Sequence, residues 1–515
     1  MKLFNVVRNR PWSFILILGL MVCVGGLIVC GFQGCGGGSF SPPASPSSTP
    51  TSPPSATTLP AFPVMASGNH RYLQDQNGVP FPILGRTAWF ITSLSETDYK
   101  MFLDDTAAKG YNAIELYVTH DPIGNNAPFA GNGSAPFTKR LDSADWDGSL
   151  SYADITKEAP DFSQPNETYW KYVDGILDYA ESKGMLSLLF PAYTGSNSYQ
   201  GWMTEMVANG ATKMTTYGAF IANRYKARGN IVWMLGGDYG TGGRIFTPPE
   251  LAVEKALLGG MKSIQGQQSK NFSAEWWGDT IYTDQTDPTL QAAGTLQGVY
   301  SFNGNVSSTA RRGYDYSSPI LPTFLLEEPY DQEGPPPDGN DVNTSATQPV
   351  RRFQWWGWLS GVGGYVSGNG YVWIFKSGWK DHLNTQGAQD MARLNAFIRS
   401  IAWYNLVPSG LGGMKTLVIA GGSLPDSNDY VAAAATPEGT LLVAYVPPDH
   451  SGPITVDMTV MSGPTRARWF DPTTAAYVDA VAGLLPPGTP VQKFTPPPGV
   501  HGDSFSDWVL LLEKQ

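Results

Sequence analysis

The chain has 515 residues, enough for two or three domains, and 42% of them are hydrophobic. Its formal charge is −11 at pH 7, which argues against binding nucleic acid or anionic lipid through bulk electrostatics. All three cysteines lie within the first 35 residues, so disulfides, thiol catalysis and Cys-ligated metals are excluded from the rest of the chain. The 16 Trp, 24 Tyr and 23 Phe are enough for a large core and an aromatic surface that suits a neutral ligand.

Residues 1–35 are predicted to direct export. Basic residues precede the uncharged run FILILGLMVCVGGLIVCGF, which is about long enough to cross a bilayer. Cys35 follows this run and precedes Gly and Ser, which resembles a bacterial lipoprotein signal with Cys35 as the lipidated residue. An uncleaved signal anchor is the alternative. Both interpretations place the protein in the cell envelope, held at the membrane by a Pro/Ser-rich linker over residues 36–65.

Residues 66–410 are predicted to alternate between strands and helices. The predicted strands are 81–89, 111–118, 185–192, 230–238, 272–277, 296–303, 319–329 and 363–375. The clearest predicted helices are 95–110, 166–184, 212–229, 249–267, 351–361 and 388–404. About eight such units favour a (β/α)₈ barrel. A doubly wound open sheet is the alternative, although no glycine-rich phosphate motif follows the first strand.

The pattern changes after residue 410. Short apolar segments separated by turns, such as TLLVAYVPP and DWVLLLEK, replace the strand–helix alternation over 411–515. This spacing is typical of a small all-β sandwich.

Two carboxylates stand at predicted strand ends. Asp238 follows two glycines at the end of the fourth strand, and Glu328 ends the seventh. Strand ends converge on the catalytic face of a barrel, so these carboxylates are expected to face each other across a pocket. A protonated and an ionised carboxyl group are what cleavage of a glycosidic bond requires. Glu328 shares the side of Phe324 and Leu326, so Glu327 is expected to point away and is the alternative to Glu328 for this role.

Aromatic and polar residues near the strand ends are predicted to bind the substrate, because Trp and Tyr can stack on the apolar faces of sugars. The predicted substrate contacts are Arg86, Trp89, His120, Tyr239, Trp276, Tyr300, Tyr330 and Trp373. For each tryptophan a place in the core is the alternative, and for His120 a structural role in a loop. No cofactor or metal is predicted, because five scattered histidines lack zinc spacing and residues 335–343 lack calcium-loop spacing.

The motifs LGRTAW, NIVWMLGGDYG and EEPYDQEG together resemble those of the apiosidase-like glycoside hydrolases, a barrel family. YWKYVDGILDYAESKGM and WYNLVPSG also fit this family, and ARWFDPTT is similar to the collagen-binding β-domain that usually follows its barrel. The resemblance covers nearly everything from about residue 66 onward. It implies that Asp238 is the general acid/base and Glu328 the nucleophile of a retaining mechanism.

The sequence departs from the family pattern in two places. Arg86 stands where the family usually has the aspartate of Gly-Asp-Thr-Ala-Trp. The family's Glu-Pro-x-Tyr-Glu-Gly appears here as Glu328-Pro-Tyr-Asp-Gln-Glu-Gly, so the spacing after the proline differs. Asp331 or Glu333 could therefore take the second acidic role.

The sequence thus predicts a membrane-anchored, retaining glycoside hydrolase that acts on a plant or microbial polysaccharide or oligosaccharide. A first alternative is a carbohydrate-binding surface protein with a degenerate barrel. A second is an adhesin whose sandwich binds the partner, which deletion of 411–515 would distinguish from an enzyme. An inverting mechanism also stays open, because the sequence does not give the distance between the carboxylates.

Overall fold

The computed structural model describes residues 59–121, 126–149, 153–195, 200–239, 245–267, 270–276, 280–284, 287–301, 305–333 and 349–515. Cys35 and the predicted signal or anchor segment lie outside these residues. No helix within the described ranges is both long and apolar enough to span a bilayer.

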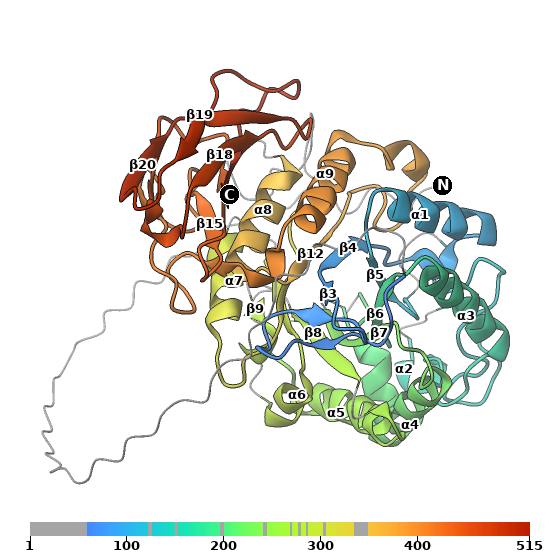
Figure 1. Ribbon diagram of the computed structural model, residues 1–515. Coiled ribbons are helices and arrows are strands. Elements are labelled where there is room, and N and C mark those ends of the chain that lie inside the picture. Colours follow the sequence, from blue (N-terminus) through green and yellow to red (C-terminus); the bar gives the residue numbers. More distant parts are fainter. Residues whose placement is uncertain are drawn as a thin grey trace, which may run out of the picture. The chain divides into compact units, whose positions relative to one another are not determined.

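Eight parallel strands with helices around them form the first part of the fold (Figure 1). In chain order the strands are β4 (Ile83–Thr87), β5 (Ala113–Tyr117), β6 (Leu186–Phe190), β7 (Ile231–Tyr239), β8 (Asn271–Trp276), β10 (Gln297–Tyr300), β11 (Thr323–Glu327) and β12 (Gly364–Ser367). β12 pairs with β4, and the short β9 (Thr280–Ile281) adds an antiparallel pairing to β10. The Thr295 amide, just before β10, donates to the Phe272 carbonyl of β8 at 2.9 Å, so the sheet is nearly closed. The predicted barrel is confirmed.

Each barrel strand is followed by at least one helix. The helices are α1 (Glu96–Ala108), α2 (Ile155–Glu158), α3 (Glu167–Ser182), α4 (Met203–Arg224), α5 (Pro248–Lys262), α6 (Pro288–Ala293), α7 (Val306–Asp315), α8 (Val350–Gly361) and α9 (Gln386–Ser400). Three short strands, β1 (Met65–Ala66), β2 (Leu73–Gln74) and β3 (Pro80–Phe81), form a separate sheet before β4. The eighth predicted strand, 363–375, is too long: β12 ends at Ser367, and the backbone then turns.

Residues after α9 form two antiparallel sheets. The six-stranded sheet contains β13 (Val407–Pro408), β15 (Ala432–Ala435), β16 (Leu441–Val446), β21 (Trp508–Lys514), β18 (Thr465–Phe470) and β19 (Tyr477–Leu485), in that spatial order. The three-stranded sheet contains β14 (Val418–Ala420), β17 (Ile454–Asp457) and β20 (Val491–Phe494). The all-β prediction for this region is confirmed.

The strands β15, β16 and β21 of the six-stranded sheet are buried on both faces, which explains why they are apolar runs rather than alternating patterns. On one face, Leu442 and Leu510 pack with Val456 of the three-stranded sheet. On the other face, Tyr445 and Leu511 join the cluster that contains the tryptophans of α8. Successive strand residues point to opposite faces, so one strand supplies two cores. The barrel and the β-region therefore share apolar surface through α8.

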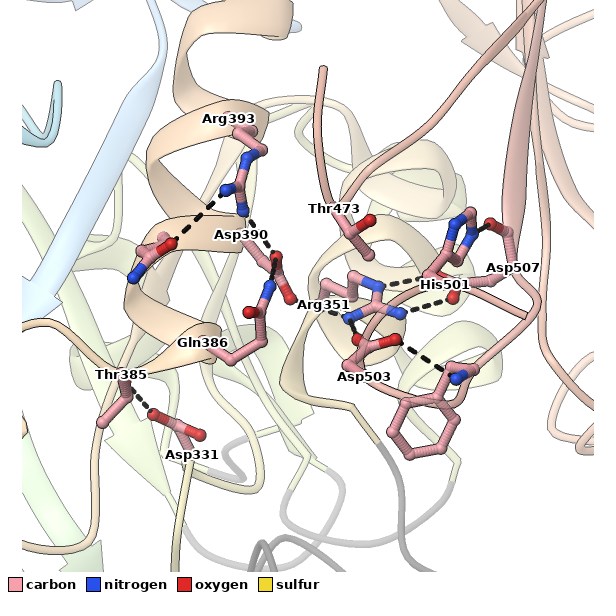
Figure 2. A network of polar contacts seen from close by, with 12 residues as sticks. Asp331, Arg351, Thr385, Gln386, Asp390, Arg393, Thr473, His501, Asp503 and Asp507 are labelled. Atoms are coloured by element: carbon pink, nitrogen blue, oxygen red, sulfur yellow. Dashed lines mark hydrogen bonds and ion pairs between the residues drawn. The ribbon is translucent and has the colours of Figure 1, made fainter. Parts of the chain in front are cut away.

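A buried ionic network joins the same elements (Figure 2). Arg351 of α8 is only 1% exposed and donates to Asp507 through Nε at 2.8 Å and Nη2 at 2.6 Å. Its Nη1 also donates to Asp390 of α9 at 2.7 Å and to Asp503 at 2.5 Å. The hydroxyl of Tyr445 donates to Asp507 at 2.9 Å. One guanidinium thus neutralises carboxylates from the barrel and from the β-region.

Glu254 of α5 leads to a prediction about stability. Its side chain is fully buried with no hydrogen-bond partner among the described residues, and burial raises its pKa to about 8. A carboxyl group whose pKa is higher in the folded state than in the unfolded state stabilises the fold at acid pH. That contribution is lost between about pH 4.5 and 8, at no more than about 1.4 kcal/mol per pH unit. Glu254→Gln should therefore stabilise the protein at pH 8 more than at pH 5.

Chemical denaturation at both pH values tests this prediction. Glu438→Gln makes the same substitution at an exposed position and provides the control for the loss of one carboxyl group. An equal effect of Glu254→Gln at both pH values would contradict the prediction.

Candidate active site

A pocket of about 200 Å³ lies at the carboxyl ends of the barrel strands. It is lined by Trp89, Tyr117, His120, Tyr193, Gln200, Asp238, Tyr300, Glu327, Tyr330, Glu333 and Trp373. Most of these side chains are aromatic or acidic, and none of these residues is Lys or Arg. The lining therefore suits an uncharged ligand with both apolar and hydroxyl-bearing faces.

The glycines before Asp238 let β7 leave its regular pairing. Gly236 pairs with Glu275 and Tyr239 with Trp276, so two β7 residues stand opposite no partner on β8. Gly236, Gly237 and Asp238 have φ values of 82°, 108° and 52°, all in the region that favours glycine. This irregularity turns Asp238 into the pocket. The aspartate is thus placed by a strained strand end rather than by an ordinary turn.

Gly237 also leaves room for two tyrosines of the pocket. A Cβ at this position would lie 2.6 Å from Cδ2 of Tyr193 and 3.1 Å from the hydroxyl of Tyr117. Gly237→Ala should therefore displace both rings and destabilise the protein by about 1–3 kcal/mol. Thermal unfolding measures the loss. Gly259→Ala is the control, because a Cβ there meets nothing within 4 Å, and an unchanged Tm in Gly237→Ala would contradict the prediction.

Two tyrosines hold the Asp238 carboxylate. Tyr193 donates to Oδ2 and Tyr300 donates to Oδ1, both at 2.8 Å. Burial raises the pKa of Asp238, although these two hydrogen bonds and the nearby His120 oppose the shift. A carboxyl group with a raised pKa can carry a proton near neutral pH, as a general acid must.

Glu327, and not Glu328, faces the pocket. Val299 of β10 pairs with Leu325 and Tyr300 pairs with Glu327, so Leu326 is an extra residue in β11. Such a β-bulge reverses the alternation of side chains beyond it. Glu328 consequently points outward, where Gln354 of α8 donates to its Oε1. The predicted orientations of Glu327 and Glu328 are therefore wrong.

Glu327 is surrounded by donors and by a second carboxyl group. The hydroxyl of Tyr330 donates to its Oε1, and Tyr300 also lies in hydrogen-bond contact with it. Trp89 donates through Nε1 to the Tyr330 hydroxyl at 2.9 Å, which fixes that tyrosine. Burial raises the pKa of Glu327 well above its usual value, and the charges of Glu275 and Asp238 raise it further.

Asp238, Glu275 and Glu327 bring one oxygen each to within 4.8 Å of one another. No other group of three His, Cys, Asp or Glu side chains in the described ranges is close enough to hold a metal ion. Tyr193 and Tyr300 donate to Asp238, and Tyr330 donates to Glu327, so hydroxyl groups already occupy oxygens that a cation would need.

Five of the predicted substrate contacts line the pocket: Trp89, His120, Tyr300, Tyr330 and Trp373. Trp89 stacks on Tyr117 with ring centroids 4.4 Å apart, and His120 stacks on Phe90 at 3.8 Å. His120 Nδ1 also lies 2.7 Å from Oδ1 of Asp121. The rings of the pocket thus support one another before any ligand binds.

The other three predicted contacts lie elsewhere, so these predictions are wrong. Arg86 points outward to α1, where it pairs with Asp105 at 2.6 Å. Tyr239 follows the inward-facing Asp238 and donates to Glu250 of α5 at 2.7 Å. Trp276 packs against Phe246 and is absent from the pocket lining. Each of them is adjacent in its strand to a residue that faces inward, and neighbouring strand residues face opposite sides.

Asp331 and Glu333 were the alternatives for the second acidic role, and one of them lies at the pocket. Glu333 lines it, and burial raises the pKa of Glu333 to about 8. Asp331 instead accepts a hydrogen bond from Thr385 at 2.6 Å (Figure 2) and another from Asn369 at 2.9 Å. Asp331 therefore secures the loop after β11 to the N-terminus of α9.

Sequence reasoning missed Tyr117, Tyr193 and Gln200 of the lining. Tyr117 lies within the predicted strand 111–118, and Tyr193 directly follows the predicted strand 185–192. The strand-end rule that selected Asp238 would have selected both tyrosines, had it been applied to the second and third strands. Gln200 had no such signal, because it lies ten residues beyond the end of β6.

Comparison with protein families matches residues 67–405 to the apiosidase-like catalytic domain. Residues 416–513 match the family described as "Putative collagen-binding domain of a collagenase". None of the curated proteins compared with the chain matches it.

Two solved structures with the same fold have titles that name glycoside hydrolases. One titled "Glycoside hydrolase" is 20% identical with a TM-score of 0.68, over 89% of this chain and 99% of its own. A glycoside hydrolase family 5 protein from Bacteroides vulgatus ATCC 8482 is 18% identical with a TM-score of 0.67, over 88% and 95%. The barrel, its acidic pocket and the match to residues 67–405 agree, and the chain belongs to the apiosidase-like family of glycoside hydrolases.

Proposed function

We propose that the chain is a retaining glycosidase that releases a neutral sugar, with Asp238 as acid/base and Glu327 as nucleophile. The observation that carries the proposal is the meeting of these two carboxylates in one aromatic pocket, with oxygens no more than 4.8 Å apart. Retaining glycosidases hold their carboxyl groups about 5–5.5 Å apart, whereas inverting enzymes need about 6.5–9.5 Å to admit a water. The short separation therefore favours retention.

The reaction proceeds in two steps. Asp238 gives its proton to the glycosidic oxygen while Glu327 attacks the anomeric carbon, which passes through an oxocarbenium-like transition state. Asp238, now ionised, takes a proton from water, and that water releases the sugar from Glu327. Tyr193 and Tyr300 hold Asp238 in place through both steps.

The two departures from the family pattern do not support a degenerate site. Arg86 packs against α1, outside the pocket. The family pattern places a glutamate three residues before its tyrosine, and Glu327 stands three residues before Tyr330. The catalytic alternative is therefore favoured over the carbohydrate-binding one.

The experiment compares the purified full chain with Asp238→Asn on a panel of plant and microbial glycans, and detects released sugars by mass spectrometry. Release by the wild type alone is expected. The anomeric configuration of the first product, followed by NMR, should match that of the substrate. If the wild type binds a glycan but releases no sugar, the result would instead establish the carbohydrate-binding alternative.

Charge complementarity gives a prediction about the substrate. The described lining contains Asp238, Glu327 and Glu333 with no Lys or Arg, so a sugar carboxylate would be repelled. Neutral aryl glycosides should be hydrolysed, whereas the corresponding aryl uronides should not. Comparable kcat/KM for a uronide and its neutral counterpart would contradict the prediction.

A further inference from the structure

His120 and Asp121 follow β5 at the edge of the pocket, and the mechanism above gives neither of them a role. The side chain of His120 lines the pocket with only 4% of its surface exposed, and Asp121 is fully buried. Burial raises the pKa of Asp238 and the nearby His120 opposes that shift, so the imidazole ring lies close to the acid/base. A substrate that reaches Asp238 therefore also passes close to His120.

Aromatic contacts hold the His120 ring in place. Phe90 stacks on it with ring centroids 3.8 Å apart and 29° between the ring planes. Tyr193 lies against it at 4.9 Å and 30°, and Tyr117 meets it edge-on at 5.3 Å. With the ring held by three neighbours, the hydrogen bonds of its nitrogens determine which of them is left for a ligand.

Both groups beside Nδ1 of His120 belong to Asp121. The backbone carbonyl oxygen of Asp121 forms a hydrogen bond with Nδ1 at 3.1 Å, and Oδ1 of the same residue lies 2.7 Å from Nδ1. A carbonyl oxygen cannot donate, so Nδ1 carries the hydrogen in this contact. Nε2 has no hydrogen-bond partner among the described residues. The nitrogen that is left for a ligand is therefore Nε2.

Asp121 is itself held in a fixed orientation. Its Oδ2 accepts a hydrogen bond from the amide of Gly201 at 2.9 Å, while its Oδ1 lies beside His120. Gly201 has a φ of 82°, and a Cβ there would lie 2.4 Å from the amide nitrogen of Gly195, so only glycine fits this turn. Gly201 directly follows Gln200, which also lines the pocket. One buried carboxylate thus secures two elements of the pocket wall.

The unused nitrogen distinguishes a substrate contact from a purely structural role. A histidine that serves only the fold is expected to pair both nitrogens within the protein, because an unpaired polar atom in a largely buried side chain is unfavourable. Nδ1 of His120 is paired in this way, and Nε2 is not. A hydroxyl group can both donate and accept a hydrogen bond, so it is a suitable partner for Nε2.

From this geometry we infer that Asp121 is a positioning residue that directs the hydrogen of Nδ1 toward itself, so that Nε2 of His120 forms a hydrogen bond with a hydroxyl group of the bound sugar. The inference rests on the proposed function, because it takes the ligand of the pocket to be a sugar. His120 touches the substrate, whereas Asp121 acts on it only through His120 and the segment that carries Gln200.

Two substitutions of His120 test which nitrogen meets the sugar. The side-chain amide of glutamine extends about as far as Nε2, whereas that of asparagine extends only about as far as Nδ1. His120→Asn should lower kcat/KM by about 10- to 100-fold, and His120→Gln should stay within about fivefold of the wild type, because only asparagine removes the buried hydrogen bond. Equal losses in the two variants would refute the assignment of Nε2.

Substrate analogues connect the loss to one hydroxyl group. Aryl glycosides of the released sugar, each lacking a single hydroxyl group, are compared on the wild type and on His120→Asn. For the hydroxyl group bound by Nε2, the wild type should lose about 10- to 100-fold in kcat/KM, and His120→Asn should add little to that loss. Additive losses for every analogue would mean that His120 binds no hydroxyl group.

Asp121→Asn tests the positioning role. The amide oxygen of the asparagine can still accept from Gly201, which leaves its NH₂ group facing Nδ1 and favours the hydrogen on Nε2 instead. The value of kcat/KM should fall by about 10- to 100-fold. Asp471→Asn is the matched control, because Asp471 lies 3.4 Å from Nδ1 of His501 and does not line the pocket. Equal kcat/KM values in Asp121→Asn and Asp471→Asn would contradict the positioning role.

A nuclear magnetic resonance measurement without substrate keeps the inference distinct from the proposed function. In protein labelled with ¹⁵N-histidine, His120 is the one signal of five that His120→Gln lacks, and its Nδ1 should carry a hydrogen. If no glycan is hydrolysed but this hydrogen is present and moves to Nε2 in Asp121→Asn, the proposed function fails and the role of Asp121 stands. If glycans are hydrolysed and Nδ1 carries no hydrogen, the inference fails alone.

Discussion

Glu327→Gln is expected to lower kcat/KM by at least about 10³-fold, whereas Glu328→Gln should stay within about tenfold of the wild type. The amide of Glu327→Gln cannot attack the anomeric carbon, and this side chain lines the pocket. Glu328 contacts Gln354 of α8 and has no oxygen at the pocket. Because the two residues are neighbours with the same chemistry, each variant is the control for the other.

Chemical rescue adds a second readout to this pair. In Glu327→Ala the space left by the carboxylate admits a small anion such as azide, which should restore turnover and give a glycosyl azide of inverted configuration. Loss of activity in Glu328→Gln with full activity in Glu327→Gln would instead identify Glu328 as the nucleophile. Circular dichroism of each variant establishes that the fold survives.

Arg351→Met is expected to destabilise the protein by about 3–5 kcal/mol, because it leaves buried carboxylates without their cation. Asp507 is fully buried, and among the described residues it keeps only the Tyr445 hydroxyl as a side-chain donor, at 2.9 Å. Burial alone would raise the pKa of Asp507, but Arg351 and its hydrogen bonds outweigh that effect and lower it. The ion pair between Arg351 and Asp507 therefore stabilises the fold at pH values above the pKa that Asp507 has in the unfolded chain. This stabilisation is lost as the pH falls through the pKa of Asp507 in the folded protein.

Chemical denaturation across pH 4–8 measures the effect. Arg393→Met is the matched control, because Arg393 pairs with the same Asp390 at 2.9 Å but is partly exposed, and about 1 kcal/mol or less is expected. Adding Asp507→Asn to Arg351→Met should recover part of the loss. Equal, small effects of Arg351→Met and Arg393→Met would contradict the prediction.

The contact between α8 and the six-stranded sheet changes how the adhesin alternative must be tested. Trp355 of α8 stacks parallel to Tyr445, and the shared cluster continues to Phe470 and Leu511. Deletion of 411–515 would expose these tryptophans and remove Asp503 and Asp507 from Arg351, so the remaining barrel is not expected to fold. Loss of activity in such a deletion would not identify an adhesin. Point substitutions on the exposed surface of β19 are the appropriate replacement.

Apolar periodicity was sufficient to predict the barrel, since all eight strands were found from their sequence runs. It located Asp238 for the same reason, because a carboxylate that follows a buried run and two glycines must lie at the end of a strand. It failed at Glu327 because the alternation rule assumes a regular strand, and the bulge at Leu326 is created by pairing with β10. No residue type or spacing within the segment LLEEP indicates that bulge.

The other errors could have been avoided. Arg86 is three residues before Trp89, so the two point to opposite sides of a regular strand. Glu275 and Trp276 are neighbours, and only one of them can face inward. By contrast, the role of Arg351 depends on partners up to 156 residues away, and no sequence spacing reveals them.

The network around Arg351 also sets an order of events for a newly made chain. Asp507 lies 156 residues beyond Arg351, and β21, the central strand between β16 and β18, follows it directly. At about 5–20 residues per second, roughly 10–30 s of synthesis separate the cation from its main counter-ion. During that interval Arg351 of α8 lacks Asp507, and the tryptophans of α8 lack their contacts with β21. The barrel should therefore stay accessible to proteases and chaperones until β21 is made, and synthesis of this strand rather than completion of the catalytic residues would mark its maturation.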